Sequence, residues 1–172
     1  RSSAASDVYK RQGDISGKRV LVRTDFNVPL DDGVIRDDLR IREAIPTLKY
    51  LVDNGAEVTA CTHLGRPKGK FEEKYSLNPV RARLNEILPG IKLLDNLRFN
   101  PGEELNDPQF IEQLVAGQDM YVNDAFGASH RKHASIMGPP QLLPSAAGRL
   151  LQNEVEILLQ VRNKPKRPFV AI

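Results

Sequence analysis

The chain has few residues of several types, and each shortage argues against a class of protein. It contains one cysteine, Cys61, and no tryptophan among its 172 residues. A single cysteine excludes an internal disulfide and is typical of a reducing compartment, so the cytoplasm is the expected location. Cys61 ends an apolar segment, which favours a small buried side chain over a reactive thiol.

Long hydrophobic runs and an excess of one charge are also missing. No apolar segment approaches the roughly 18 residues that a membrane-spanning helix requires. The 25 Lys and Arg residues are offset by 22 Asp and Glu, which leaves a formal net charge of +3. Only 6% of the residues are aromatic, and none is interleaved with the basic loops as in RNA-binding platforms. We therefore expect neither a membrane nor a nucleic acid as partner.

The chain does contain enough apolar residues for one globular core. Hydrophobic residues make up 40% and charged residues 27% of the sequence, which is typical of a single domain of this length. Residues 1–12 lack an initiator Met and the apolar stretch of a signal peptide, and we expect them to be a non-native or disordered leader. The last residues, "RPFVAI", stop inside a strand-like run. Residues 13–172 are therefore expected to be one domain of a longer protein.

From residue 19 onward, short apolar runs alternate with segments of helical periodicity. This alternation predicts an α/β fold, a three-layer doubly wound (Rossmann-like) parallel sheet with helices on both faces. The predicted strands are 19–24, 57–62, 91–95, 119–122 and 169–172. The predicted helices are 37–55, 78–88, 106–116 and 146–162.

Capping residues and apolar stripes refine these helices. Asp37 or Asp38 is expected to cap the first helix, in which Pro46 either starts or kinks the helix. Asn78 and Asp107, each followed by proline, are expected to cap the second and third helices. The fourth helix is expected to turn a core-facing stripe toward the sheet, made of Leu150, Leu151, Val155, Leu158 and Leu159.

Polar and mostly cationic residues follow the predicted strands. Ligands of open parallel sheets bind beyond the carboxyl ends of the strands, and all three histidines of the chain lie there or within three residues of it. Arginine forks match both phosphate and carboxylate groups, whereas a carboxylate suits a ligand hydroxyl. Together they predict a site for a small phosphorylated hydroxy acid, built from Asp25, Asn27, Arg40, His63, Gly65, Arg66, Asn96, Arg98, His130 and Arg131.

Several residues near this edge have a structural interpretation that competes with a functional one. Lys68 and Lys70 are interpreted as solvated loop residues. His133 is as consistent with a hydrogen-bonded structural histidine as with a ligand contact. Asn123 and Asp124 are interpreted as caps or braces of their loop rather than as ligand contacts.

Metal and nucleotide sites find little support in the sequence. His130 and His133 are three residues apart, but no third ligand joins them at short spacing, so no metal site is predicted. A phosphate-cradling Walker A loop needs four residues between its glycines and a hydroxyl after the lysine. Here three residues separate Gly65 from Gly69, and Phe71 replaces the hydroxyl. This loop is therefore predicted to belong to the anion site rather than to hold ATP.

Seven segments in order resemble the N-terminal domain of phosphoglycerate kinase, from about residue 17 to residue 172. They are "VRTDFNVP", "DDLRIREAIPTLKYL", "THLGRPKGK", "KYSLNPV", "NLRFNPGEE", "YVNDAFGASHRKHAS" and "RPFVAI". The resemblance implies the substrate-binding half of a monomeric, two-domain glycolytic enzyme that reversibly transfers a phosphoryl group between ATP and the carboxylate of 3-phosphoglycerate. Transfer from ATP to 3-phosphoglycerate yields 1,3-bisphosphoglycerate. Mg-ATP or Mg-ADP would bind to the C-terminal domain, which this chain lacks, so the chain alone is expected to be inactive.

The resemblance also implies roles for individual residues. Arg40 matches the arginine that meets the transferred phosphoryl group and is the expected catalytic residue. No residue of this chain is implied to bind a cofactor or a metal. The residues implied to bind the substrate are Asp25, Phe26, Asn27, Arg40, His63, Leu64, Gly65, Arg66, Arg98, His130 and Arg131.

The chain departs from the family pattern in one large way. The family usually has a further strand and helix before "KLLDNLRF", where this chain has only Pro89 and Gly90. Asp95 and Thr24 are milder departures, at positions where the family commonly has Glu, and Val or Ala. A stand-alone α/β module that binds phosphoacids or phosphosugars is the alternative function, because the sequence carries an anion site and no nucleotide site.

Overall fold

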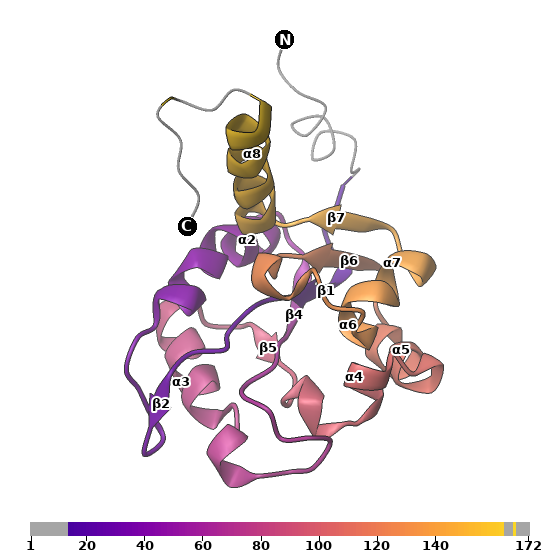
Figure 1. The fold of residues 1–172 in the computed structure, drawn as a ribbon. Coiled ribbons are helices and arrows are strands. Elements are labelled where there is room, and N and C mark those ends of the chain that lie inside the picture. The colour runs from indigo at the N-terminus through magenta and orange to yellow at the C-terminus, as the bar shows by residue number, and fades with distance from the viewer. Residues whose placement is uncertain (1–13, 164–166, 168–172) are drawn as a thin grey trace.

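The computed structural model describes residues 14–163 and 167. The leader predicted at residues 1–12 and the strand predicted at 169–172 lie outside the described residues. A five-stranded parallel sheet forms the centre of the fold (Figure 1). Its strands, in spatial order, are β5 (Lys92–Leu93), β4 (Glu57–Cys61), β1 (Arg19–Arg23), β6 (Met120–Asn123) and β7 (Ser145–Ala147).

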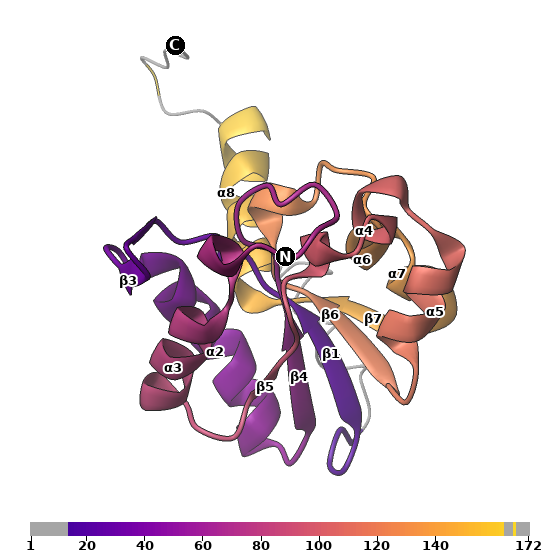
Figure 2. The ribbon, with the colours of Figure 1, turned by 90° about the horizontal axis from the view of Figure 1, so that it is seen from below.

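Helices cover both faces of this sheet. In Figure 2, α2 (Leu39–Asp53) and α3 (Asn78–Ile87) lie on one side. The other side carries α4 (Gly102–Leu105), α5 (Pro108–Val115), α6 (Ala134–Met137) and α7 (Pro139–Leu142). The chain runs outward from β1 to β4 and β5, and then returns to add β6 and β7 on the other side of β1. This reversal confirms the predicted three-layer, doubly wound α/β fold.

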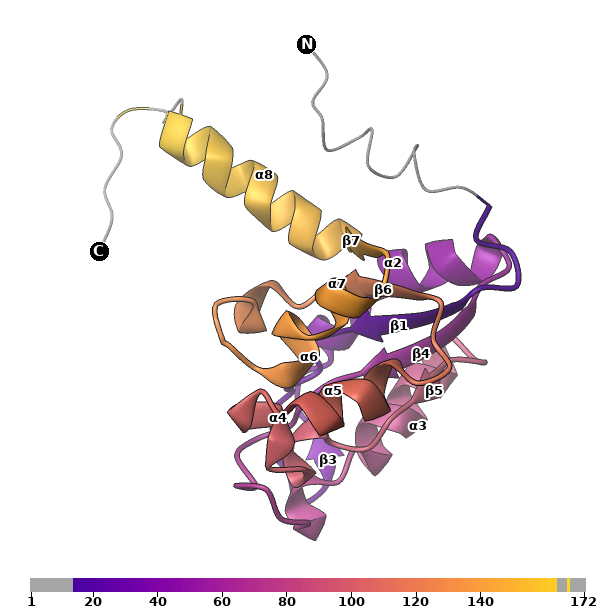
Figure 3. The ribbon, with the colours of Figure 1, turned by 90° about the vertical axis from the view of Figure 1, so that its right-hand side faces the viewer.

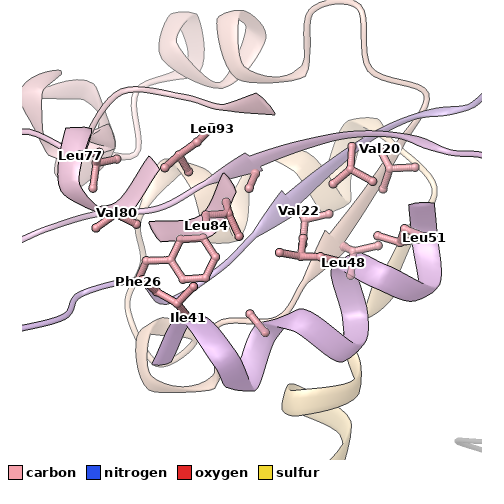
Figure 4. Close-up of a cluster of buried hydrophobic side chains, with 14 of the residues drawn as sticks. Val20, Val22, Phe26, Ile41, Leu48, Leu51, Leu77, Val80, Leu84 and Leu93 are labelled. Atoms are coloured by element: carbon pink, nitrogen blue, oxygen red, sulfur yellow. The ribbon is translucent and has the colours of Figure 1, made fainter. Parts of the chain in front are cut away.

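The strands are buried on both faces, as expected for a parallel sheet. Val20 and Val22 of β1 face the larger core, whereas Leu21 faces the smaller one. Figure 4 shows the larger core between the strands, α2 and α3. Cys61 is fully buried, and burial raises the pKa of its thiol to about 12, so Cys61 packs as a small apolar residue, as predicted.

The caps predicted for α2 and α5 are present, that of α2 only in part. Asp38 occupies the N-cap position of α2, but its side chain makes no cap bond, and Asp37 supplies the hydrogen bond instead. Asp37 Oδ1 accepts a hydrogen bond of 2.8 Å from the backbone N–H of Leu39, where α2 begins, and Pro46 lies inside that helix. Asp107 caps α5 by accepting from the N–H of Phe110 at 2.9 Å.

The prediction that Asn78 caps α3 is wrong. Leu77 occupies the N-cap position and is buried, and Asn78 is the first helical residue. The Asn78 side chain instead accepts a hydrogen bond of 2.8 Å from Arg81 Nη1. Packing of the leucine therefore sets the start of this helix.

The fourth predicted helix begins three residues later than the sequence indicates. Residues 145–147 form β7, and α8 runs over Arg149–Asn163. Pairing of the small residues of β7 with β6 outweighs the helical preference of alanine. Gly148 separates the two elements, because a Cβ there would lie 2.1 Å from Asp124 Oδ1. The same oxygen accepts from the N–H groups of Leu150 and Leu151, at 3.0 and 3.2 Å, and so caps α8.

The core stripe predicted for this helix is also wrong. No described residue of α8 is fully buried, and the exposed fractions of Val155, Leu158 and Leu159 are 41%, 51% and 47%. The helix packs against α2, and Figure 3 shows it extending away from the sheet. Among the described residues, no second layer lies over the apolar face of its later turns.

Short elements complete the connections. A hairpin of β2 (Leu30–Asp31) and β3 (Val34–Ile35) precedes α2. Single helical turns occur at η1 (Glu73–Tyr75), η2 (Leu97–Phe99) and η3 (Phe126–Ala128). Beside the edge strand β5 lies a hollow of about 440 Å³. Apolar side chains from β5's exit and from α5 line much of it, including Leu94, Leu97, Phe99, Phe110 and Leu114.

Candidate functional site

The carboxyl ends of β1, β4, β5 and β6 lie next to one another at one edge of the sheet. All four strands are parallel neighbours, with Arg23 paired to both Cys61 and Asn123. The loops that leave them therefore meet on the same side, as the sequence predicts. These loops carry the candidate residues 25–27, 63–66, 98 and 130–131.

Asp25 and Arg40 form an ion pair at this edge. Arg40 Nη1 donates to Asp25 Oδ2 at 2.6 Å, and the aspartate side chain is only 13% exposed, whereas that of Arg40 is 52% exposed. The partly buried carboxylate thus holds an arginine that still faces solvent. Phe26 is buried, and its N–H donates to Thr62 Oγ1 at 2.9 Å, which ties the β1 loop to the β4 loop.

Gly65 joins three of the loops. Its N–H donates to Asn27 Oδ1 at 2.9 Å, and its carbonyl oxygen accepts from Arg98 Nη1 at 2.7 Å. The residue has a φ of +60°, and a Cβ at this position would lie 2.2 Å from a ring carbon of Tyr75. Only glycine fits this backbone and this contact, so the loop geometry depends on it.

Asn96 supports the loops that meet at Gly65. This buried side chain accepts from the N–H groups of Leu64 and Arg98 at 3.2 and 3.1 Å. Its Nδ2 donates to the carbonyl oxygens of Leu64 and Tyr75 at 2.8 and 3.1 Å. Both ends of the amide are therefore satisfied, which fixes the loop after β4 against the turn η2.

Arg98 and His63 are buried basic groups. Arg98 is 3% exposed, and burial lowers its pKa, although Glu104, at 3.3 Å, acts in the opposite direction. His63 is 6% exposed, and its Nδ1 lies 3.0 Å from Nη2 of the fully buried Arg23. Burial, followed by the nearby charges of Arg23, Arg98 and Arg131, holds the pKa of His63 far below its usual value.

The remaining basic candidates are less tightly held. Arg131 is half-buried, and its charge lowers the pKa of both His63 and Arg98. The side chains of Arg66 and His130 are exposed and form no hydrogen bond with any described residue. Lys68 and Lys70 are exposed as well.

The structural interpretations of two polar neighbours are confirmed. Asn123 Oδ1 accepts from the N–H of Ala125 at 3.0 Å, and its Nδ2 donates to Ser129 at 3.0 Å, so it braces its loop. Asp124 caps α8 as described above, and burial raises its pKa. His133 Nδ1 lies 3.7 Å from an oxygen of the buried Glu103.

Sequence reasoning missed Arg23, Glu103 and Ser135, which are completely buried beneath the site. Arg23 was hidden because it ends a strand in which the three residues before it are apolar. A charged residue in a strand buried on both faces is the signal that could have revealed it. Nothing in the sequence pattern singled out Glu103 or Ser135, because both lie in short segments without clear periodicity.

A hollow of about 260 Å³ opens beside Gly65. It is lined by Asn27, Val28, Leu30, Leu64, Gly65, Lys74 and Tyr75. In the described part of the chain, no three His, Cys, Asp or Glu side chains are grouped to hold a metal ion. None of the described helices has the length and apolar character needed to cross a membrane.

Comparison with known proteins matches this chain to one family. A family model described as phosphoglycerate kinase matches residues 10–92 and 89–172. The chain belongs to the phosphoglycerate kinase family. It is similar to the phosphoglycerate kinase of Dictyoglomus turgidum, with 47% identity over 94% of this chain and 47% of that protein. It is also similar to the chloroplastic phosphoglycerate kinase of Chlamydomonas reinhardtii, with 49% identity over 98% of this chain and 42% of that protein.

Solved structures agree with the family and the fold. The structure of phosphoglycerate kinase from Coxiella burnetii superposes with a TM-score of 0.84 at 35% identity, over 90% of this chain and 45% of that one. The enzyme from Pyrococcus horikoshii gives a TM-score of 0.81 at 28% identity, with the same coverage. The chain thus spans about half the length of the relatives it matches.

The comparisons also locate a gap in the chain. The two family matches meet at residues 89–92, and the alignments extend over 183 to 196 positions, more than the 172 residues of the chain. The chain therefore skips family positions, in agreement with the strand and helix expected to be missing at Pro89 and Gly90. In this chain β5, the strand that follows the gap, is an edge strand beside the apolar hollow next to α5.

Proposed function

We propose that this chain is the substrate-binding half of a phosphoglycerate kinase. The parent enzyme would reversibly transfer a phosphoryl group between ATP and the carboxylate of 3-phosphoglycerate, in glycolysis. The observation that supports this most strongly is the convergence of Asp25, Asn27, His63, Arg98 and Arg131 at one sheet edge in a chain of this family.

The chemistry of this reaction suits the residues at this edge. The attacking group is a carboxylate, which is already ionised at neutral pH, so no general base is required. Catalysis then depends on positioning the substrate and on stabilising negative charge. We assign the substrate phosphate to His63, Arg66, Arg98 and Arg131, with His130 beside them.

Arg40 is the proposed catalytic residue. Its side chain is exposed and attached to Asp25, which leaves part of the guanidinium free to meet a transferred phosphoryl group. Asp25 and Asn27 would accept from or donate to the hydroxyl and carboxylate of the glycerate. Phe26, Leu64 and Gly65 would shape the loops around it. Mg-ATP or Mg-ADP is assigned to the half of the family's length that this chain does not match.

Titration calorimetry with 3-phosphoglycerate, inorganic phosphate and a phosphosugar tests this proposal. We expect 3-phosphoglycerate to bind more tightly than phosphate, and Arg131→Ala to weaken that binding by about tenfold. Lys68→Ala is the matched control and should bind like the unaltered chain. Equal affinity for 3-phosphoglycerate and phosphate would contradict the kinase assignment. Equal affinity for the phosphosugar would favour the alternative, a general phosphoacid- or phosphosugar-binding module.

Three further properties belong to the same proposal. The chain alone, supplied with Mg-ATP and 3-phosphoglycerate, is expected to show no turnover in a coupled assay. The family resemblance implies a monomer, which light scattering measures directly. A cytoplasmic location is proposed from the single buried thiol.

A further inference from the structure

Beneath the candidate site, four buried side chains form a continuous row of hydrogen bonds. Glu103, Ser135 and Arg23 are completely buried, and His63 nearly so. They come from α4, α6, β1 and the loop after β4. Ser135 Oγ donates to Glu103 Oε1 at 2.7 Å, and Arg23 Nε donates to Ser135 Oγ at 2.8 Å. Arg23 Nη2 then lies 3.0 Å from His63 Nδ1.

The chemistry of arginine fixes the direction of each of these bonds. A guanidinium has five donors and no acceptor, and it does not lose its proton in proteins. Ser135 Oγ must therefore accept from Arg23, and its single proton goes to Glu103. For the same reason His63 Nδ1 must accept from Arg23, so it carries no hydrogen. The one proton of a neutral imidazole ring is then on Nε2.

A charged ring would be unfavourable at this position. Protonating Nδ1 would place two N–H groups head to head. The other groups that act on the ring are Arg98, Arg131 and His133, and together with burial they all lower its pKa. Glu103 does not offset these effects through a hydrogen bond to the His63 ring, because its two carboxylate oxygens accept from the backbone N–H and the hydroxyl of Ser135. Nε2 of His63 has no hydrogen-bond partner among the described residues, and it keeps some contact with solvent.

We propose that Glu103 and Ser135 are positioning residues that orient Arg23, which holds His63 as the neutral tautomer protonated at Nε2. His63 then offers an anionic ligand an uncharged donor of fixed direction, set among arginines that supply the charge. Its hydrogen bond to the ligand is therefore constant between about pH 5.5 and pH 8, whereas an ordinary histidine gains charge in this range. The role of the ligand rests on the proposed function, but the tautomer does not.

Nuclear magnetic resonance of ¹⁵N-labelled histidine side chains in the ligand-free, 172-residue chain tests the tautomer. We expect His63 to show an unprotonated Nδ1 and a protonated Nε2, with signals unchanged between pH 5.5 and pH 8. A proton on Nδ1, or a titration of His63 in this range, would overturn the proposal without any ligand or variant.

The positioning role is tested by Ser135→Ala and Ser135→Thr. The alanine variant removes the oxygen that links Arg23 to Glu103, so the Nε2-protonated form should give way to a mixture of tautomers. The threonine variant keeps the hydroxyl and should restore the original signals. Ser145→Ala, at an exposed serine of β7, is the control. Arg23→Lys, which keeps the charge but loses the planar fork, is the second test and should give the same mixture. Unchanged His63 signals in Ser135→Ala or Arg23→Lys would contradict the positioning role.

Binding of 3-phosphoglycerate separates this inference from the function it rests on. Ser135→Ala should bind the ligand at least about fivefold more weakly, as expected for one misdirected hydrogen bond, and Ser135→Thr should recover the affinity. If the unaltered chain shows the expected tautomer but does not bind 3-phosphoglycerate, the proposed function fails and the positioning of His63 stands. If it binds, and Ser135→Ala changes neither the affinity nor the tautomer, the positioning role fails alone.

Discussion

The strand ends and helix α8 both depart from the usual placement of side chains. Polar side chains are buried beneath the strand ends, whereas apolar side chains are exposed on α8. Beneath the strand ends, Arg23, Glu103 and Ser135 have no exposed surface. On α8, Leu158 and Leu159 are about half exposed, at 51% and 47%. The buried polar groups are satisfied by one another, whereas the apolar groups of α8 have no covering layer among the described residues. In these two regions burial therefore follows position in the fold rather than residue type, and the two regions should respond differently to mutation.

The largest expected effect is that of Glu103→Ala. Removing this carboxylate leaves two buried donors of Ser135, the backbone N–H and the hydroxyl, without their acceptor. At about 1–3 kcal/mol for each donor, the variant should lose about 2–6 kcal/mol of the free energy of unfolding. Urea unfolding followed by far-ultraviolet circular dichroism measures it, since the chain has no tryptophan. Glu112→Ala, at an exposed residue of α5 that forms no ion pair with the described residues, is the control and should cost less than about 0.5 kcal/mol. Similar losses in the two variants would show that the buried row contributes little.

A leucine in each of two helices sharpens the comparison. Leu48→Ala removes a fully buried side chain of α2 and should cost about 2–5 kcal/mol. Leu158→Ala should change the free energy of unfolding by no more than about 0.5 kcal/mol, because the side chain is exposed. Both variants can be measured by the same urea titration. A large loss in Leu158→Ala would mean that α8 is covered in solution.

The pH dependence of stability tests the buried histidine. The pKa of His63 is lowered in the folded chain from an ordinary value of 6.5, so below that value the unfolded chain binds a proton that the folded chain does not. The contribution of His63 to the free energy of unfolding is therefore fully present above pH 6.5 and is lost as the pH falls. Between pH 7 and pH 5 the loss is about 2 kcal/mol for one such group.

His63→Gln, which does not titrate, is the comparison for this measurement. Its unfolding free energy should fall less than that of the unaltered chain over the same pH range, because contributions from other groups cancel in the difference. Equal slopes would indicate that His63 gains its proton in the folded chain.

A smaller loss than those at Glu103, Leu48 and His63 is expected at the start of α8. Asp124→Ala removes the acceptor for the N–H groups of Leu150 and Leu151, which costs about 1 kcal/mol. Hydrogen exchange should become faster at these two amides and stay unchanged in α2. Asp124→Asn keeps an acceptor and should largely preserve their protection. Unchanged exchange in the alanine variant would show that the cap does not hold this turn.

The sequence was a good guide to the order of elements and to the location of the site. Alternating strand and helix patterns predicted the sheet, and the parallel order then required the loops after β1, β4 and β6 to meet. That rule brought Asn27, His63 and Arg131 to one edge without any knowledge of their contacts. The glycine-rich loop also fits this edge, with Gly65 linking Asn27 and Arg98.

The parts that sequence reasoning missed depend on contacts between distant segments. Periodicity shows that one side of α8 is apolar, but it does not show whether another layer exists to cover that side. Small residues such as those at 145–147 are compatible with a helix or a strand, and pairing with β6 decides between them. The row from Glu103 to His63 joins four separate segments, so no local pattern contains it.

The central position of β1 has a consequence for how the chain folds during synthesis. β1, β4 and β5, with α2 and α3, build most of the larger core from the first part of the chain. The other edge of β1 stays unpaired until β6 is made, and Arg19 is held by Asp119, 100 residues later. Such non-local pairing is slow, and an open strand edge invites pairing with other chains. We therefore expect the unpaired edge of β1 to be open to misassembly until β6 leaves the ribosome.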